Sequence, residues 1–239
     1  IFLSSYNLFM KRVAISQSNY IPWKGYFDLI NMVDEFILYD DVQYTRRDWR
    51  NRNQIKTQHG LKWLSIPAMV KGKYFQKISE TKISDDNWGK KHWSVLKQNY
   101  SKAQHFKEYK DVFEDLYLNN KDEYLSQVNY KFIGAINKIL GVSTKVRWSS
   151  EFDLTGGQSE KLLGICKDCD TDVYLSGPSA KNYLNEDIFI QNNIKVEWMD
   201  YSNYPEYKQI FKPFEHGVTI LDLIFNEGEN ATKFMKSFN

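Results

Sequence analysis

The residues whose types and spacing best suit chemistry lie between positions 40 and 53. Asp40 and Asp41 stand side by side, and four arginines follow within residues 46–52. A carboxylate in such a place can act as a general base or hold a divalent cation. Guanidinium groups can bind a phosphate or carboxylate through two parallel hydrogen bonds, which a lysine cannot form. We therefore predict an anion-binding site here, with an exposed loop of salt bridges as the alternative.

A second candidate is the polar turn at residues 16–23. Its amide and hydroxyl side chains suit hydrogen bonding to a sugar or a base, and the rings of Tyr20 and Trp23 suit stacking. The turn has no glycine-rich fingerprint, so the sequence does not support a dinucleotide site or a Walker-type phosphate loop. A structural turn stiffened by Pro22 is the alternative.

Two later segments carry weaker candidates. Ser176 and Gly177 lie between a short apolar run and an expected helix start, where free backbone amides bind anions, and Lys181 adds a positive charge. Tyr207 and Gln209 offer an aromatic ring and an amide close together. An ordinary capped turn and simple packing are the respective alternatives.

The four histidines match no metal-ligand spacing, and no metal site is predicted. His92, between Lys91 and Trp93, is the histidine best placed for acid–base work, because its ordinary pKa lies near neutrality. A buried or surface histidine without such a role is the alternative. Cys166 and Cys169 form one C-x-x-C late in a helical stretch, where residues three apart share a face, so neither a redox pair nor a zinc site is favoured.

The pattern of apolar residues supplies the elements that must position these side chains. Residues 13–15 and 36–39 are expected strands on either side of an expected helix at 24–34, which indicates a parallel α/β unit. The remaining expected elements are extended segments at 61–67 and 75–83, helices at 88–100, 106–118, 124–140, 159–169 and 218–225, and strands at 145–148, 173–175 and 194–198. The sequence therefore predicts an α/β fold with a parallel or mixed sheet of Rossmann-like character and a helical insert in the middle of the chain. In such sheets ligands bind outside the carboxyl ends of the strands, where both leading candidates lie.

Composition limits the class of protein. The 239 residues include 7 Trp, 16 Tyr and 15 Phe, too many for a disordered chain. Because 32 basic residues face 30 acidic ones, no global field attracts nucleic acid, and none is predicted as a partner. No transmembrane segment is predicted, and the scarcity of cysteine favours the cytoplasm. Residues 1–9 are interpreted as a non-native or upstream extension before Met10, and residues 10–239 as a single domain.

Longer motifs resemble one protein family. In chain order they are Gln17-x-Asn19-Tyr20-x-Pro22-Trp23-x-Gly25-Tyr26-Phe27, Asp40-Asp41-Val42-Gln43-Tyr44, Asn51-Arg52-Asn53-x-Ile55, Trp63-Leu64-x-x-Pro67, Tyr174-Leu175-Ser176-Gly177, Tyr183-Leu184 and Thr219-Ile220-Leu221-Asp222-Leu223-Ile224-Phe225-Asn226-x-Gly228. In this combination the chain resembles the WbqC-like family. The family's first motif usually reads His-Gln-Pro, whereas this chain has Ser16-Gln17-Ser18, so the family histidine is missing here.

WbqC-like proteins are associated with bacterial surface-polysaccharide gene clusters, including O-antigen biosynthesis. The resemblance implies a role in this synthesis but no single reaction. Our leading hypothesis is an enzyme that modifies a nucleotide-linked amino sugar by N-acyl or aminoacyl transfer. Its expected partners are a sugar or nucleotide-sugar substrate and a carrier-bound acyl donor, and no cofactor is identified. Nucleotidyl transfer is a less favoured alternative, because the first turn lacks the two histidines that such folds use. A non-catalytic glycan-binding or scaffold protein is the other alternative.

The leading hypothesis assigns roles within the predicted site, and the resemblance supplies the matched positions. Asp41 is the expected general base, with His92 as a second catalytic candidate. The matched polar positions are Gln17, Asn19, Asp41, Gln43, Arg47, Asn51 and Arg52. In this hypothesis arginines 47, 50 and 52 bind a pyrophosphate or carrier phosphate, the amides of Gln17, Asn19 and Asn51 read sugar hydroxyls, and Tyr20 and Trp23 stack on the ligand.

Overall fold

The computed structural model describes residues 10–238, and its centre is a five-stranded parallel sheet in the order β5-β2-β1-β6-β7. The strands are β1 (Arg12–Ser16), β2 (Glu35–Leu38), β5 (Lys145–Trp148), β6 (Val173–Ser176) and β7 (Lys195–Trp198). Helices connect the strands and cover both faces, as parallel sheets require. The predicted α/β, Rossmann-like fold class is confirmed.

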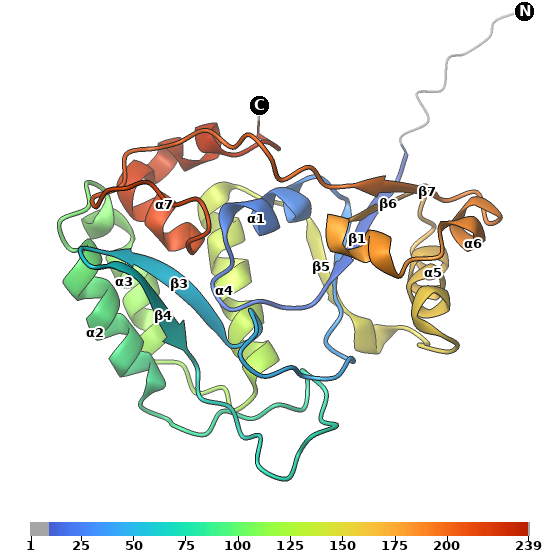
Figure 1. Cartoon of the computed structure of the whole chain (residues 1–239), viewed down its shortest axis with the longest axis horizontal. Helices are drawn as coiled ribbons and strands as arrows, with labels where there is room; N and C mark the ends of the chain where they lie inside the picture. The colour runs from blue at the N-terminus through green and yellow to red at the C-terminus, as the bar shows by residue number, and fades with distance from the viewer. Residues whose placement is uncertain (1–9, 239) are drawn as a thin grey trace, which may run out of the picture.

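Alternation along the strands creates a separate core on each face of the sheet. In β1, Val13 and Ile15 point to one face, where they pack with α5 (Gln158–Asp168) and α6 (Glu186–Ile190). Ala14 points to the other face, in a core with α1 (Lys24–Asn31) and α7 (Ile220–Glu227). Figure 1 shows α5 and α6 on one side of the sheet and α1 and α4 on the other.

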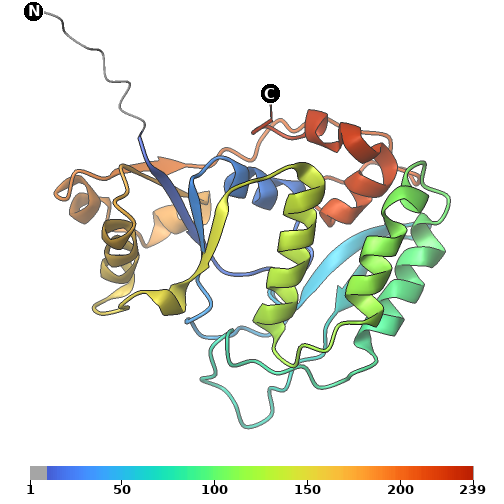
Figure 2. The same ribbon diagram turned by 180° about the vertical axis from the view of Figure 1, so that it is seen from behind.

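The segment between β2 and β5 holds a hairpin and three helices. The hairpin pairs β3 (Arg52–Thr57) with β4 (Gly60–Ser65), and the helices are α2 (Trp88–Tyr100), α3 (Phe106–Leu118) and α4 (Leu125–Leu140). Helix α4 ends at Gly141, whose φ of +73° suits glycine and closes the helix as expected. Figure 2 shows α4 alongside the sheet and α2 and α3 further out, so α4 is the element of the insert that reaches the sheet.

Short helical turns complete the fold: η1 (Ser149–Glu151), η2 (Pro178–Asn182) and η3 (Gly228–Phe234). No helix among residues 10–238 is long and apolar enough to span a bilayer. The interpretation of residues 1–9 concerns a part of the chain outside the described residues. That residues 10–239 form a single domain stays a prediction.

One expected extended segment, at 75–83, forms no strand. Its backbone pairs with irregular chain instead: Ile78 donates its N–H to the Val42 carbonyl at 2.9 Å, and Ile83 donates to the Glu123 carbonyl at 2.8 Å. The apolar and polar residues alternate as in a strand, but no strand lies beside this segment with which it could form a ladder of hydrogen bonds. The segment ties the carboxyl edge of β2 to the start of α4.

Candidate functional site

The chain changes direction within the sheet at β1. It moves outward from β1 through β2 to β5, then returns to β6 on the opposite side of β1 and continues to β7. The loops after β1 and β6 therefore diverge, and the crevice between them is where open parallel sheets bind ligands. Ser16 and Ser176 end these two strands, so the first and third segments predicted from sequence leave the same edge.

A buried polar cluster joins the ends of β1 and β2 to the helical insert. Asp40, 1% exposed, accepts a hydrogen bond at Oδ1 from the Ser18 N–H at 2.8 Å. Asn129 of α4 donates to the Ser18 hydroxyl at 3.0 Å and to the Arg50 carbonyl at 2.9 Å. Residues far apart in sequence thus meet at the sheet edge.

Three buried atoms of this cluster have no hydrogen-bond partner. They are Asp40 Oδ2, Asn129 Oδ1 and Arg50 Nε. Buried polar groups are nearly always paired, so the concentration of three unpaired atoms at this sheet edge makes the cluster the candidate site. The set contains two acceptors and one cationic donor, which suits a ligand that carries both an amine or hydroxyl and an anionic group.

Burial also changes the acidity of Asp40. It raises the pKa of this carboxyl from 3.8 to about 6, against the opposing effects of the Ser18 hydrogen bond and the Arg50 charge. A carboxyl group that titrates near neutrality can both take and return a proton, as a general base must. Asp40 therefore combines an unpaired oxygen with a suitable pKa.

Asp41, the base expected from the sequence, has a different environment. Its Oδ2 accepts from the Ser149 hydroxyl at 2.7 Å, and its Oδ1 lies 3.2 Å from Lys77 Nζ. Both oxygens are engaged in fixing η1 and the segment after β4. The base assignment to Asp41 remains a prediction, and the geometry favours its neighbour Asp40.

A cavity of about 320 Å³ opens beside the cluster. It is lined by Asn19, Pro22, Trp23, Trp49, Asn53, His216 and Gly217. Consecutive residues serve the two features: Ser18 and Arg50 belong to the cluster, whereas Asn19 and Trp49 line the cavity. Its size is at the small end of ligand pockets, and two tryptophans with amides suit a monosaccharide unit.

The turn that carries Asn19 is held from β3. Asn53 Nδ2 donates to the Tyr20 carbonyl at 3.1 Å and to the Ile21 carbonyl at 2.9 Å, and the Tyr20 N–H donates to the Trp49 carbonyl at 3.0 Å. Ile21 has a φ of +37°, which a β-branched residue rarely adopts. Such strain persists where the surroundings fix it, and it gathers at ligand sites. The turn is therefore preorganised.

The predicted arginines take three different positions. The Arg50 side chain is largely buried, and its guanidinium donates to Asp48 Oδ1 at 3.3 Å. Arg52 places its guanidinium over the Trp63 ring, 4.0 Å from the ring centre. Arg47 is exposed, with a φ of +57°. Arg50 is the arginine that the structure brings into the cluster.

Three predicted amide side chains lie at the same edge with different tasks. Asn51 donates to the Ile66 carbonyl at 2.8 Å and so supports the hairpin, while Gln43 donates to the Tyr74 carbonyl at 2.9 Å. Gln17 accepts the Tyr26 hydroxyl at 2.9 Å through its backbone carbonyl, so its side chain is not used in that contact. The role expected of the Gln17 side chain remains a prediction.

The prediction that Tyr20 stacks on a ligand is wrong. Its ring is 0% exposed, and its hydroxyl lies 2.8 Å from both His92 Nδ1 and the Tyr117 hydroxyl. His92 Nε2 lies 3.2 Å from the Ser65 carbonyl, which can only accept, so Nε2 carries the proton and Nδ1 accepts from Tyr20. Both side chains are committed to an aromatic core between the first turn and α2.

His92 is correspondingly unsuited to its predicted acid–base role. Burial lowers its pKa from 6.5 to about 4, so the ring is neutral at pH 7. The folded state therefore binds fewer protons than the unfolded state between these values, and the stability that His92 provides is complete above pH 6.5 and lost as pH falls through 4. The shift corresponds to about 3 kcal/mol.

We expect His92→Gln to remove this pH dependence. The free energy of unfolding of the original chain, minus that of the variant, should fall by about 3 kcal/mol between pH 6.5 and pH 4. Urea unfolding at pH values across this range measures the difference. A difference that stays constant with pH would contradict the buried, neutral ring.

The third predicted segment stands at the end of β6. Ser176 is buried, and a Cβ added to Gly177 would lie 3.9 Å from the Tyr201 hydroxyl. Lys181, in η2, places its ammonium 5.5 Å from the centre of the Trp198 ring. These residues border the crevice, but Lys181 is drawn toward β7 rather than toward Asp40.

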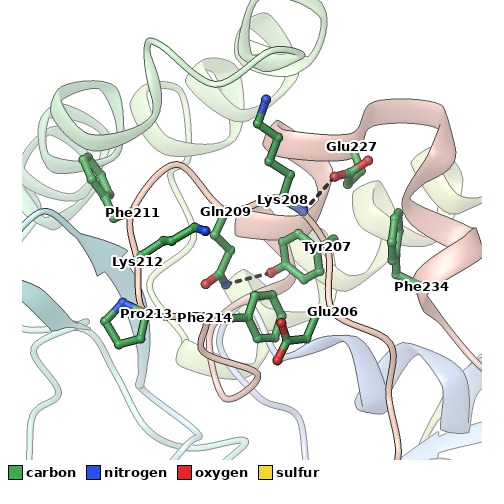
Figure 3. A pocket seen from close by; sticks show the side chains of 10 residues that line it. All are labelled: Glu206, Tyr207, Lys208, Gln209, Phe211, Lys212, Pro213, Phe214, Glu227 and Phe234. Atoms are coloured by element: carbon green, nitrogen blue, oxygen red, sulfur yellow. Dashed lines mark hydrogen bonds between the residues drawn. The ribbon is translucent and has the colours of Figure 1, made fainter.

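Tyr207 and Gln209 belong to another cavity. It measures about 740 Å³ and lies against the long loop after β7 (Figure 3). The Tyr207 hydroxyl and Gln209 Nε2 both donate to Asp222 Oδ1, at 2.7 and 3.0 Å. Their polar ends are used within the protein, so the predicted substrate contacts have no support here.

Several site residues were not singled out from the sequence. Asn129 comes from the middle of a helix, where nothing in the pattern distinguishes it. His216 reaches the cavity only through the fold, and Asn53, although part of a quoted motif, was given no role. Trp49, whose place between charged residues is unusual for a solvated loop, carried the one usable signal. Among residues 10–238, no group of three or more His, Cys, Asp or Glu side chains is placed to hold a metal ion.

Comparison with known proteins agrees with the motifs. The profile of the WbqC-like protein family matches residues 17–234. The chain is also 49% identical over 227 residues to "Uncharacterized protein Rv1507c" of Mycobacterium tuberculosis. The aligned region covers 95% of this chain and 98% of that protein. No solved structure matches significantly.

Proposed function

This chain belongs to the WbqC-like protein family, and from this premise we propose that it is a cytoplasmic enzyme of bacterial surface-polysaccharide synthesis. Its proposed reaction is N-acyl or aminoacyl transfer to a nucleotide-linked amino sugar. The observation that supports this most is the buried cluster of Asp40, Arg50 and Asn129, with its unpaired atoms, beside an aromatic cavity.

In the proposed reaction the sugar amine attacks the carbonyl carbon of a carrier-bound acyl group. A C–N bond forms, the bond from the carbonyl carbon to the carrier breaks, and the amine loses a proton. Asp40 takes that proton through Oδ2 and returns one to the departing carrier atom. Because its pKa is about 6, the carboxyl is ionised and ready to accept at neutral pH.

The other residues would bind and orient the substrate. Arg50 would contact the pyrophosphate, for which a guanidinium is well shaped, with Arg47 and Arg52 nearby on the same segment. Trp23 and Trp49 would cover the apolar faces of the sugar, and Asn19 would read a hydroxyl.

A thermal-shift screen against nucleotide amino sugars tests this proposal. A ligand at 100 times its dissociation constant should add about 2.7 kcal/mol of stability to the original chain. We expect Arg50→Ala to lose this stabilisation and Arg46→Ala to keep it. Arg46 is the matched control because it is an exposed arginine of the same segment, and its side chain donates to the Val70 carbonyl at 3.2 Å.

The other outcomes would contradict the proposal in distinct ways. Stabilisation by ATP alone would favour nucleotidyl transfer. Saturable binding of the sugar with no product in the presence of acyl donors would favour a glycan-binding module. No response to any sugar or nucleotide would leave a scaffold role.

A further inference from the structure

A loop at residues 69–77 carries the most exposed aromatic pair of the described chain. Tyr74 is 74% exposed and Phe75 is 83% exposed. The two rings meet edge to face, with their centres 5.0 Å apart. Two adjoining rings this open to water form an apolar patch, and such patches mark surfaces that bind another molecule or a membrane.

The loop is also basic. Lys71 and Lys73 flank its tip, Lys77 follows, and no acidic residue occurs between residues 69 and 77. Lys77 forms an ion pair with Asp41, but within residues 10–238 neither Lys71 nor Lys73 has a carboxylate in ion-pair distance. Arg46 adds a further positive charge beside Val70. The two rings therefore stand among unpaired cations.

Hydrogen bonds give the loop a defined shape. Gln76 Nε2 donates to the Met69 carbonyl at 2.8 Å and closes its neck. The Lys73 N–H donates to the Val70 carbonyl at 3.2 Å, and Gly72, with a φ of +73°, makes the turn. A preformed loop of this kind loses little entropy when it binds.

We propose that this loop docks the protein on the surface of an anionic lipid bilayer, with Tyr74 and Phe75 in the headgroup region and the lysines against lipid phosphates. Aromatic rings favour the membrane interface, and lysines near an anionic surface strengthen binding about fivefold each. A protein partner fits less well, because a stable interface buries about 800 Å² on each side and a narrow two-ring tip cannot supply that area.

The position of the loop links docking to the candidate site without depending on its chemistry. Gln43 donates to the Tyr74 carbonyl, and Lys77 pairs with Asp41, so the loop is fixed to the chain that leaves β2. In Figure 1 the segment between β4 and α2 protrudes on the side toward which β1 runs, which is the carboxyl edge of the sheet. A docked molecule would turn that edge toward the membrane.

Sedimentation of the full chain with lipid vesicles tests the proposal. We expect binding to phosphatidylcholine vesicles that contain 30% phosphatidylglycerol, and at least tenfold weaker binding to pure phosphatidylcholine. The double change Tyr74→Ser and Phe75→Ser should weaken binding at least tenfold, and Lys71→Gln with Lys73→Gln should weaken it by about twentyfold. The matched control is Leu118→Ser with Ile190→Ser, two exposed apolar residues elsewhere, which should bind as the original chain does.

Three results would overturn the proposal. The first is equal vesicle binding by the loop variants and the original chain. The second is no binding of the original chain to either kind of vesicle. The third is self-association of the original chain, without vesicle binding, that the change of Tyr74 and Phe75 to serine abolishes. Because the substituted side chains are exposed, circular dichroism and thermal unfolding should be unchanged, which separates lost docking from lost folding. None of these readouts involves sugar binding, so failure here leaves the proposed function standing.

Discussion

Asp40→Asn is expected to gain stability relative to the original chain as pH rises, and to lose function. In the original chain the pKa of Asp40 is 3.8 unfolded and about 6 folded. The folded state therefore binds more protons between these values, so the stability provided by the protonated carboxyl is complete below pH 3.8 and lost as pH rises through 6. The shift corresponds to about 3 kcal/mol of stability that the original chain loses as pH rises. Asparagine does not ionise, so the variant keeps that stability.

Urea unfolding at several pH values measures this effect. The free energy of unfolding of Asp40→Asn, minus that of the original chain, should grow by about 2.5 kcal/mol between pH 4 and pH 7.5. Titration of His92 occurs in both proteins and cancels in the difference. Asp41→Asn is the control: its carboxylate has the Ser149 hydroxyl and Lys77 as partners, so we expect a small loss of stability, about 1 kcal/mol.

The same pair of variants separates the two candidate bases. In the proposed transfer reaction Asp40→Asn should abolish turnover while nucleotide-sugar binding is retained, because Arg50 and the tryptophans remain.

If the stability difference between Asp40→Asn and the original chain does not change with pH, that would contradict a buried Asp40 carboxyl with a raised pKa. Loss of turnover in Asp41→Asn, with full turnover in Asp40→Asn, would return the role of base to Asp41, as expected from the sequence.

Asp222→Ala is expected to cost the largest amount of stability of any single change considered. This carboxylate, buried in α7, accepts from the Tyr100 hydroxyl at 2.8 Å, the Tyr207 hydroxyl at 2.7 Å and Gln209 Nε2 at 3.0 Å. Burial raises its pKa, and these donors oppose the rise. Alanine would leave several donors buried without an acceptor, so we expect a loss of about 3–5 kcal/mol.

Chemical unfolding followed by fluorescence measures this loss. The midpoint should fall while the dependence on denaturant is unchanged, as expected when stability alone is altered. Tyr207→Phe is the matched comparison: it removes one donor and leaves the acceptor with its other partners, so we expect a loss of about 1 kcal/mol. Similar losses in the two variants would mean that Asp222 does not organise this part of the core.

The second role of Asp222 is to hold the wall of the larger cavity. Because Tyr207 and Gln209 are oriented by it, Asp222→Ala should also disturb the loop after β7, including the side that ends at His216 in the smaller cavity. If nucleotide sugars stabilise Asp222→Ala less than the original chain, the cause would be the displaced loop. Asp222 itself would not contact the ligand.

The fold was largely predictable because its signals are local. Apolar alternation and helical spacing identify strands and helices within windows of a few residues, and the central helices end where glycine or polar turns occur. The expected strands at 13–15, 36–39 and 173–175 correspond to β1, β2 and β6 of the sheet, with β2 ending at Leu38. The prediction of a strand at 75–83 was wrong, because an alternating pattern does not reveal whether a neighbouring strand exists to pair with the segment.

The sequence by itself determined the family, the fold class and the edge of the sheet at which polar residues gather. It did not determine which of those residues are free to act. Tyr20 and His92 have the right chemistry, yet the tertiary structure uses both in a core; Asp40 and Asp41 are neighbours in sequence, yet only Asp40 is buried beside unpaired partners. Burial and pairing depend on contacts between distant segments, such as Asn129 with Ser18, and these contacts also set the pKa values.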